Sequence, residues 1–139
     1  MEVVRGCFVD TSAWFALKFV DDAHHAAAVR VRRRIEEAGQ LMYTSDWVLA
    51  EAVGLAERRA DRVAAREMGK MILKNPAIQV RAVSAEALAQ AWDHYAAAGS
   101  GPSIVDCASF AVMEELGLTR AFAFDEDFVK AGFQVERAS

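Results

Sequence analysis

The chain has 139 residues, of which 54% are hydrophobic and 26% charged, with only two prolines and eight glycines. This composition is typical of one folded domain over residues 1–139 and excludes a disordered or low-complexity chain. The formal net charge of −4 excludes a uniformly basic nucleic-acid-binding surface, although acids gathered in one cation-filled pocket would leave the remaining surface locally basic.

The first apolar run, residues 3–9, is typical of a short buried strand that ends at Asp10. Thr11 or Ser12 is expected to cap a helix over residues 13–18. The next predicted elements are a helix over 22–38, a strand over 41–44, a helix that is capped by Thr44 or Ser45 and contains 47–55, and a helix over 61–74.

The second half of the chain repeats this alternation around one clear loop, residues 99–102, and Pro102 suits the first turn of the following helix. The predicted elements are a strand over 78–83, a helix from the cap Ser84 to near Gly99, a helix that ends at Gly117, a strand over 121–124, a helical turn through Phe128 and a strand over 133–136. Alternating strands and helices predict an α/β fold, a three-layer α/β/α domain with a central, mostly parallel sheet of four to five strands.

Cysteine usage and hydropathy bear on the compartment. Cys7 and Cys107 lie far apart without Cys or His neighbours at metal-ligand spacing, so neither a disulfide framework nor a zinc site is predicted. The run that ends at Asp10 is interrupted by Arg5 and is too short and polar for a signal peptide, and no apolar stretch approaches the length of a membrane span. We expect a soluble cytoplasmic protein.

Two acids stand where predicted strands end. Asp10 and Asp125 each follow an apolar strand. Because the carboxyl ends of parallel strands share one edge of the sheet, where ligands bind in open α/β folds, both side chains are expected to face one crevice.

Two further acids, Glu51 and Asp106, interrupt apolar stretches of predicted helices, and neither has a basic residue three or four positions away. A lone acid in such surroundings is costly unless it is paired or binds a cation. All-oxygen ligands with room for water and phosphate suit Mg²⁺ or Mn²⁺, so the four acids predict a divalent metal site. For any one acid alone, an ordinary role as a cap or a solvated helix-edge residue stays open.

Four blocks of sequence resemble, in order and spacing, the PIN-domain ribonucleases, and most of all the VapC-type toxins of prokaryotic toxin–antitoxin pairs. The blocks are residues 8–14 (FVDTSAW), 44–51 (TSDWVLAE), 103–111 (SIVDCASFA) and 124–128 (FDEDF) followed by 131–133 (AGF). Residues 21–25 with Ala28 also look like the segment that follows the first helix in those toxins. The combination of four ordered blocks is specific, although each block alone is weak.

The resemblance implies a metal-dependent endoribonuclease that forms a homodimer and binds an antitoxin protein. By that likeness the metal ligands, directly or through water, are Asp10, Glu51, Asp106 and Asp125. It also implies that Asp127 is an auxiliary acid and that Thr11, Ser12 and Ser103 orient ligands or the scissile phosphate. One departure is Ala123, where many relatives have Thr, which leaves Asp125 with less hydrogen-bonding support.

Basic, aromatic and histidine residues remain ambiguous in the sequence. A basic stripe at helical spacing is either an RNA-backbone track or a solvated face that balances nearby acids, and it comprises Arg59, Arg62, Arg66 and Lys70. The aromatic residues beside the acid motifs are either core or RNA-stacking residues, and they are Trp14, Phe15 and Trp47. The histidines, expected to be surface or packing residues, are His24, His25 and His94.

Two other functions compete with a nuclease. One is a PIN fold kept only as a non-catalytic interaction module, and the other is a receiver-like acidic signalling domain that binds Mg²⁺. A receiver needs a Lys at the end of a late strand, where this chain has Asp125. The sequence does not name the RNA target, because RNA is recognised through shape and short unpaired motifs.

Overall fold

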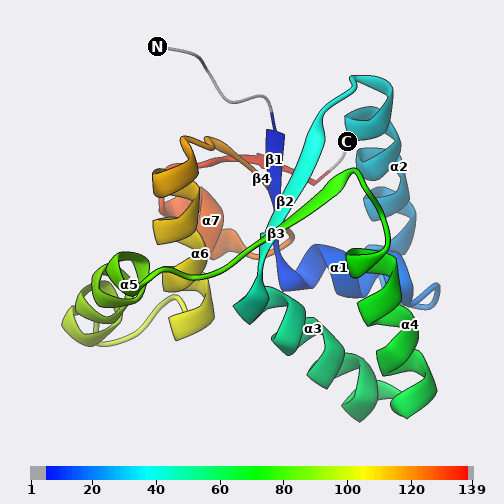
Figure 1. The fold of residues 1–139 in the computed structure, drawn as a ribbon, viewed down its shortest axis with the longest axis horizontal. Coiled ribbons are helices and arrows are strands. Elements are labelled where there is room, and N and C mark those ends of the chain that lie inside the picture. The colour runs from blue at the N-terminus through cyan, green and yellow to red at the C-terminus, as the bar shows by residue number, and fades with distance from the viewer. Residues whose placement is uncertain (1–5, 138–139) are drawn as a thin grey trace.

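The computed structural model describes residues 6–137, which form a five-stranded parallel sheet with helices on both faces (Figure 1). The strands, in the spatial order β3-β2-β1-β4-β5, are β1 (Gly6–Val9), β2 (Leu41–Ser45), β3 (Ile78–Arg81), β4 (Arg120–Phe122) and β5 (Gln134–Glu136). The chain order changes direction at β1, which places a ligand-binding crevice beyond the carboxyl ends of β1 and β4. The predicted α/β architecture is confirmed.

Seven helices in the described part of the chain cover the sheet. They are α1 (Thr11–Lys18), α2 (His25–Glu37), α3 (Asp46–Arg59), α4 (Arg62–Leu73), α5 (Ala85–Ala97), α6 (Ile104–Leu116) and α7 (Glu126–Lys130). In Figure 1, α1 to α4 lie on one side of the sheet and α5 to α7 on the other, with α5 packed on α6. Over residues 6–137, no helix is long and apolar enough to cross a membrane.

Burial and two side-chain hydrogen bonds hold the carboxyl end of β1 in place. All four residues of β1 are buried, as expected for a strand covered on both faces. Behind it, the buried Trp14 indole Nε1 donates to Thr44 Oγ1 (3.3 Å), and the Thr44 hydroxyl donates to the Val9 carbonyl (3.0 Å). Trp14 is therefore a core residue, and these bonds hold the ends of β1 and β2 together beneath the predicted site.

The start of α6 differs from the predicted boundary, and part of the first predicted strand lies outside the described residues. Helix α6 begins at Ile104 with Ser103 as its N-cap, so Pro102 lies before the helix and not in its first turn. The Ser103 side chain caps the helix instead, by accepting the free Asp106 N–H of the first turn. The part of the first predicted strand that covers residues 3–5 lies outside the described residues.

Candidate active site

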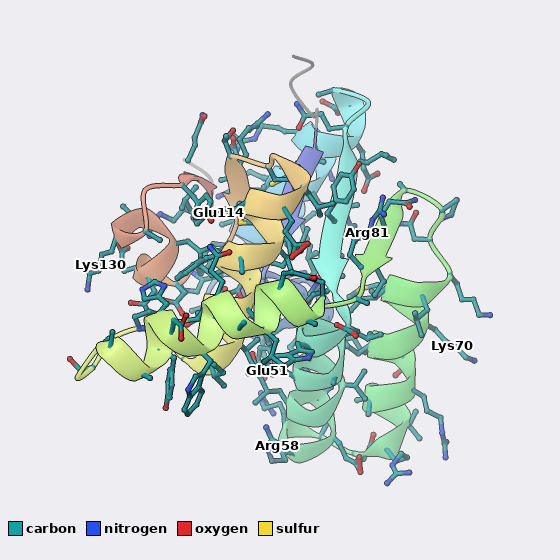
Figure 2. All side chains as sticks on the ribbon, turned by 60° about the vertical axis from the view of Figure 1, so that its left-hand side comes forward. Glu51, Arg58, Lys70, Arg81, Glu114 and Lys130 are labelled. Carbon is teal, nitrogen blue, oxygen red and sulfur yellow. The ribbon has the colours of Figure 1, made fainter. Side chains whose placement is uncertain are left out.

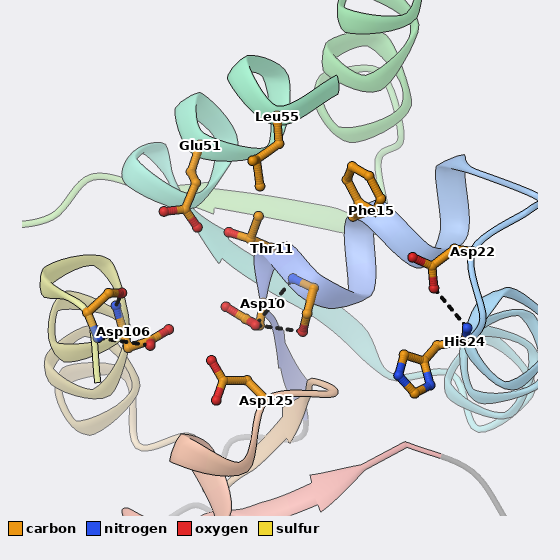
Figure 3. A pocket seen from close by; sticks show the side chains of 11 residues that line it. Asp10, Thr11, Phe15, Asp22, His24, Glu51, Leu55, Asp106 and Asp125 are labelled. Atoms are coloured by element: carbon orange, nitrogen blue, oxygen red, sulfur yellow. Dashed lines mark hydrogen bonds between the residues drawn. The ribbon is translucent and has the colours of Figure 1, made fainter. Parts of the chain in front are cut away.

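An acid-lined pocket of about 460 Å³ lies beyond the carboxyl ends of β1 and β4 (Figure 3). Side chains from α1, α3, α6 and the two strand ends form its walls. The lining residues are Asp10, Thr11, Ser12, Phe15, Asp22, His24, Glu51, Leu55, Ser103, Asp106 and Asp125.

The structure brings the four predicted acids into this one pocket. Asp10, Asp106 and Asp125 each offer a carboxylate oxygen, and these oxygens lie within 4.8 Å of one another. They come from the end of β1, the first turn of α6 and the residue before α7. Glu51 lies outside this group of three but lines the same pocket from α3, and Figure 3 shows its carboxylate directed toward them.

Local hydrogen bonds fix Asp10. Its Oδ2 accepts from the Ser12 N–H (3.2 Å) and from the Ser12 hydroxyl (2.7 Å). The Ser12 hydroxyl in turn accepts from the Phe124 N–H (3.0 Å), which ties the end of β1 to the end of β4. Asp10 itself is thus the N-cap of α1, and the expectation that Thr11 or Ser12 caps this helix was wrong, because the Asp10 carboxylate reaches the free N–H groups first.

The other two carboxylates are positioned by helix starts. Asp106 and Ser103 form a reciprocal capping box, in which the Asp106 N–H donates to Ser103 Oγ (3.0 Å) and the Ser103 N–H donates to Asp106 Oδ2 (3.1 Å). Asp125 caps α7 by accepting from the Asp127 N–H (2.8 Å). The Asp127 side chain does not line the acid pocket, and its backbone N–H is what bonds Asp125. Burial, followed by the charge of Asp125, raises the pKa of Asp127.

The pocket is electrostatically strained without a cation. Burial raises the pKa of Asp10 from 3.8 to about 6, against the hydrogen bonds from Ser12. Burial, followed by the charge of Asp10, raises the pKa of Asp106 from 3.8 to about 7. Among residues 6–137, no Lys, Arg or His forms an ion pair with either of them or with Asp125.

The donor set fits a hard divalent cation. The three clustered ligand atoms are all carboxylate oxygens, and Mg²⁺, Mn²⁺ and Ca²⁺ prefer oxygen ligands. The hydroxyl of Thr11, which is 5% exposed, is the one buried side-chain polar atom in the described chain that has no hydrogen-bond partner. Thr11 lines this pocket, so a bound ion, its water or a phosphate would supply the missing partner.

The predicted basic stripe does not line the pocket. Arg59 pairs with Asp21, and Arg62 pairs with Glu57 at 3.0 Å. The four residues do not share one helical face as predicted, because Arg59 ends α3 whereas the other three lie on α4. Figure 2 shows Lys70 projecting on the side away from Glu51. Any contact of the stripe with RNA would therefore lie outside the acid pocket.

Two aromatic side chains line the pocket: Phe15, for which the sequence left a core and an RNA-stacking role open, and His24, which was expected to be a surface or packing residue. His24 stacks on Phe124 with ring centroids 4.4 Å apart and an interplanar angle of 11°, so it is a packing residue that also forms a pocket wall. Phe15 is half-buried and lies one helical turn beyond Thr11. The spacing of Phe15 from the acid motif was a usable signal, whereas the position of His24 depends on a ring a hundred residues further along the chain.

A parallel five-stranded sheet with clustered acids at the carboxyl ends of β1 and β4 is the arrangement of a PIN-type nuclease domain. The family model described as PIN domain matches residues 7–134, and the chain belongs to the PIN-domain family.

The relatives narrow the class. Over 127 residues, 91% of this chain and 94% of theirs, the protein is 38% identical to two Mycobacterium tuberculosis proteins named 23S rRNA-specific endonuclease VapC20, one from each of two strains. The crystal structure of Mycobacterium tuberculosis VapC20, described as a sarcin-ricin loop cleaving toxin, is similar with a TM-score of 0.81 and 35% identity, covering 92% of this chain and 96% of that one. The likeness to VapC-type toxins is confirmed.

Proposed function

We propose that this protein is a metal-dependent endoribonuclease that hydrolyses RNA phosphodiester bonds as the toxin of a toxin–antitoxin pair. The observation that carries the proposal is the group of three carboxylates, from Asp10, Asp106 and Asp125, with oxygens within 4.8 Å and no basic partner in the described chain. Such a group is stable as a charged cluster only with a bound cation.

Each residue of the site has a distinct part in the proposal. Asp10, Asp106, Asp125 and Glu51 hold Mg²⁺ or Mn²⁺, directly or through water. When bound, the cation lowers the pKa of water and stabilises negative charge on the phosphate and the leaving oxygen.

The residues around the four acids orient them. Ser12 and Ser103 fix the carboxylates of Asp10 and Asp106 before metal arrives. The Thr11 hydroxyl is free to bond a water or a phosphate oxygen. The auxiliary residue Asp127 steadies Asp125 through its backbone N–H.

We propose 23S rRNA as the substrate class, since the two relatives at 38% identity carry that specificity in their name. Arg66 and Lys70, for which no ion pair is found within residues 6–137, are proposed to contact the RNA backbone outside the pocket, with a smaller contribution from the already paired Arg59 and Arg62. Further parts of the proposal are a single PIN domain over residues 1–139, a homodimer, an antitoxin protein partner and action in the cytoplasm.

The test is cleavage of 23S rRNA and a panel of short labelled RNAs with Mg²⁺, with Mn²⁺ or with EDTA. We expect metal-dependent cleavage that EDTA abolishes and that is lost in Asp10→Asn and Asp106→Asn. Asp93→Asn is the matched control, because Asp93 is an exposed acid on α5 outside the pocket. Cleavage that survives EDTA, or equal activity of all three variants, would refute the proposal.

A further inference from the structure

The pocket has two chemically different ends. Helix α1 presents Thr11 beside the acids and Phe15 four residues later, and helix α3 presents Glu51 and then Leu55 with the same spacing. Residues four apart lie on one face of a helix, one turn or about 5.4 Å apart. Both helices therefore lead from a polar position at the carboxylate cluster to an apolar position one turn away, as Figure 3 shows.

His24 closes the apolar end. Its ring lies flat on Phe124, at a centroid distance of 4.4 Å and an angle of 11°, so one face of the imidazole is covered while the residue as a whole stays exposed. Next to it, Asp22 accepts the His24 backbone N–H at Oδ1 (2.8 Å), which holds the Asp22 carboxylate at the pocket wall. Figure 3 shows Asp22 and His24 together at the end of the pocket away from Asp106.

We propose that this apolar end is a subsite for one unpaired RNA base next to the scissile phosphate, an inference that rests on the proposed nuclease function. The base lies against Phe15 and His24, and the Asp22 carboxylate accepts from N–H donors on the base edge. Unpaired bases are recognised in this way in RNA–protein complexes, by stacking on aromatic rings and by hydrogen bonds to their edges.

The composition of the apolar end favours a base over the other parts of a nucleotide. Among residues 6–137, no Lys or Arg lines the pocket, and the negative Asp22 stands at this end, so a second phosphate is disfavoured here. A ribose has no planar face to match the Phe15 and His24 rings. Continuity with the carboxylate cluster places the occupant one nucleotide at most from the phosphate under attack.

The test couples protein and RNA substitutions in one cycle. After the cut is mapped, the base on each side of it is removed in turn to give abasic RNAs, and kcat/KM is measured for the wild type, Phe15→Leu and His24→Ala. With intact RNA, each variant is expected to lose roughly five- to 150-fold, the range for loss of one stacked base. When the RNA lacks the base that occupies the subsite, the variants and the wild type should cleave it equally, because the stacking contact is already absent.

Two further variants separate stacking from structural damage. Phe15→Tyr keeps the ring and should restore coupling to the base. Trp92→Leu removes an exposed aromatic residue outside the pocket and should leave kcat/KM unchanged for both intact and abasic RNAs. A loss in Phe15→Leu and His24→Ala that is equal for intact and abasic RNAs at every position would overturn the subsite.

A binding readout removes the dependence on catalysis. Product RNAs that end at the cut, with 2-aminopurine as the terminal base, are expected to show fluorescence quenching on the wild-type protein and reduced quenching on Phe15→Leu. Equal quenching on both proteins would contradict the proposal. Absence of any metal-dependent cleavage by the wild type would instead refute the nuclease function, so the two failures are distinguishable.

Discussion

Two polar clusters of this molecule differ in whether their charges are balanced within the chain. On the β4–β5 edge, the half-buried Arg120 donates from Nε to Glu136 Oε1 (3.0 Å) and from Nη1 to Gln40 Oε1 (3.1 Å), so charge and hydrogen bonds are balanced within the chain. In the acid pocket, Asp10 and Asp106 are more deeply buried and repel each other. A cluster that serves only the fold neutralises itself, whereas the acid cluster depends on a cation from outside.

The largest expected effect comes from removing one charge of the acid cluster. Asp106→Asn should lower cleavage by more than the roughly 10- to 100-fold that loss of an outer-shell partner costs. At a pH well above 7, the metal-free variant should have a higher free energy of unfolding than the metal-free wild type, because the substitution removes a buried, repelled charge. Nuclease assays and urea denaturation in EDTA check both. A metal-free variant less stable than wild type would show that Asp106 serves the fold.

The acid cluster should also give the metal-free protein an unusual pH dependence. Because the folded-state pKa values of Asp10 and Asp106 are raised to about 6 and about 7, the folded protein retains protons that the unfolded chain has already released. The resulting stabilisation is complete below about pH 4 and is lost as pH rises through about 6 to 7, by a few kcal/mol in total.

Metal should reverse this trend. Mg²⁺ binds only the ionised carboxylates, so its stabilising effect should grow over the same pH range. Urea denaturation across this range, with EDTA and with saturating Mg²⁺, gives the two curves. Parallel curves would contradict a metal site at Asp10 and Asp106.

The order of elements was predictable because short buried strands and amphipathic helices leave separate patterns in this chain. The acids that end β1 and β4 were predictable for the same reason: Asp10 and Asp125 follow apolar runs whose parallel arrangement brings their ends together. Glu51 and Asp106 stood out by the absence of basic neighbours, and the structure places both in the pocket.

What the sequence could not predict depends on distant contacts. The His24 wall exists because Phe124 stacks on it from the end of β4, and no local pattern encodes that pairing. The basic stripe was predicted to follow one helical face, but Arg59 ends α3, and a new helix, capped by Asp61, carries the other three residues. Spacing also does not say that Arg59 and Arg62 are paired with acids or that the stripe lies outside the pocket. The N-cap of α1 was misplaced because Asp10, already assigned to the metal site, also serves as the cap.

A smaller effect is expected from the hydroxyl that orients Asp10. Ser12→Ala removes the 2.7 Å bond to Asp10 and the acceptor for the Phe124 N–H, while all four acids remain. We expect a loss of roughly 10- to 100-fold in metal affinity or kcat/KM. Titration with Mn²⁺ checks this: wild-type affinity and activity in Ser12→Ala would show that the bond is dispensable.

In the Arg120–Glu136–Gln40 cluster, loss of one charge should lower stability and leave cleavage unchanged, the opposite of the result expected for Asp106→Asn. Glu136→Gln removes the charge that faces Arg120 but keeps an amide of similar shape. We expect the free energy of unfolding to fall by about 1 kcal/mol, since the pair is partly exposed, with no change in metal-dependent cleavage. A gain in stability, or a loss of cleavage in the folded variant, would remove the distinction between the two clusters.

Two buried hydroxyls, those of Thr11 and Thr44, separate a ligand-binding role from a structural one. The buried Thr11 hydroxyl has no partner, so Thr11→Val should leave the metal-free protein as stable as the wild type, or more stable by up to about 1 kcal/mol. Thr44→Val is the matched control: its hydroxyl bonds Trp14 and the Val9 carbonyl, and its loss should cost about 1–3 kcal/mol. Cleavage by Thr11→Val should nevertheless fall several-fold, because the hydroxyl gains its partner only when metal and RNA are bound. Unchanged cleavage together with lost stability would make Thr11 part of the scaffold.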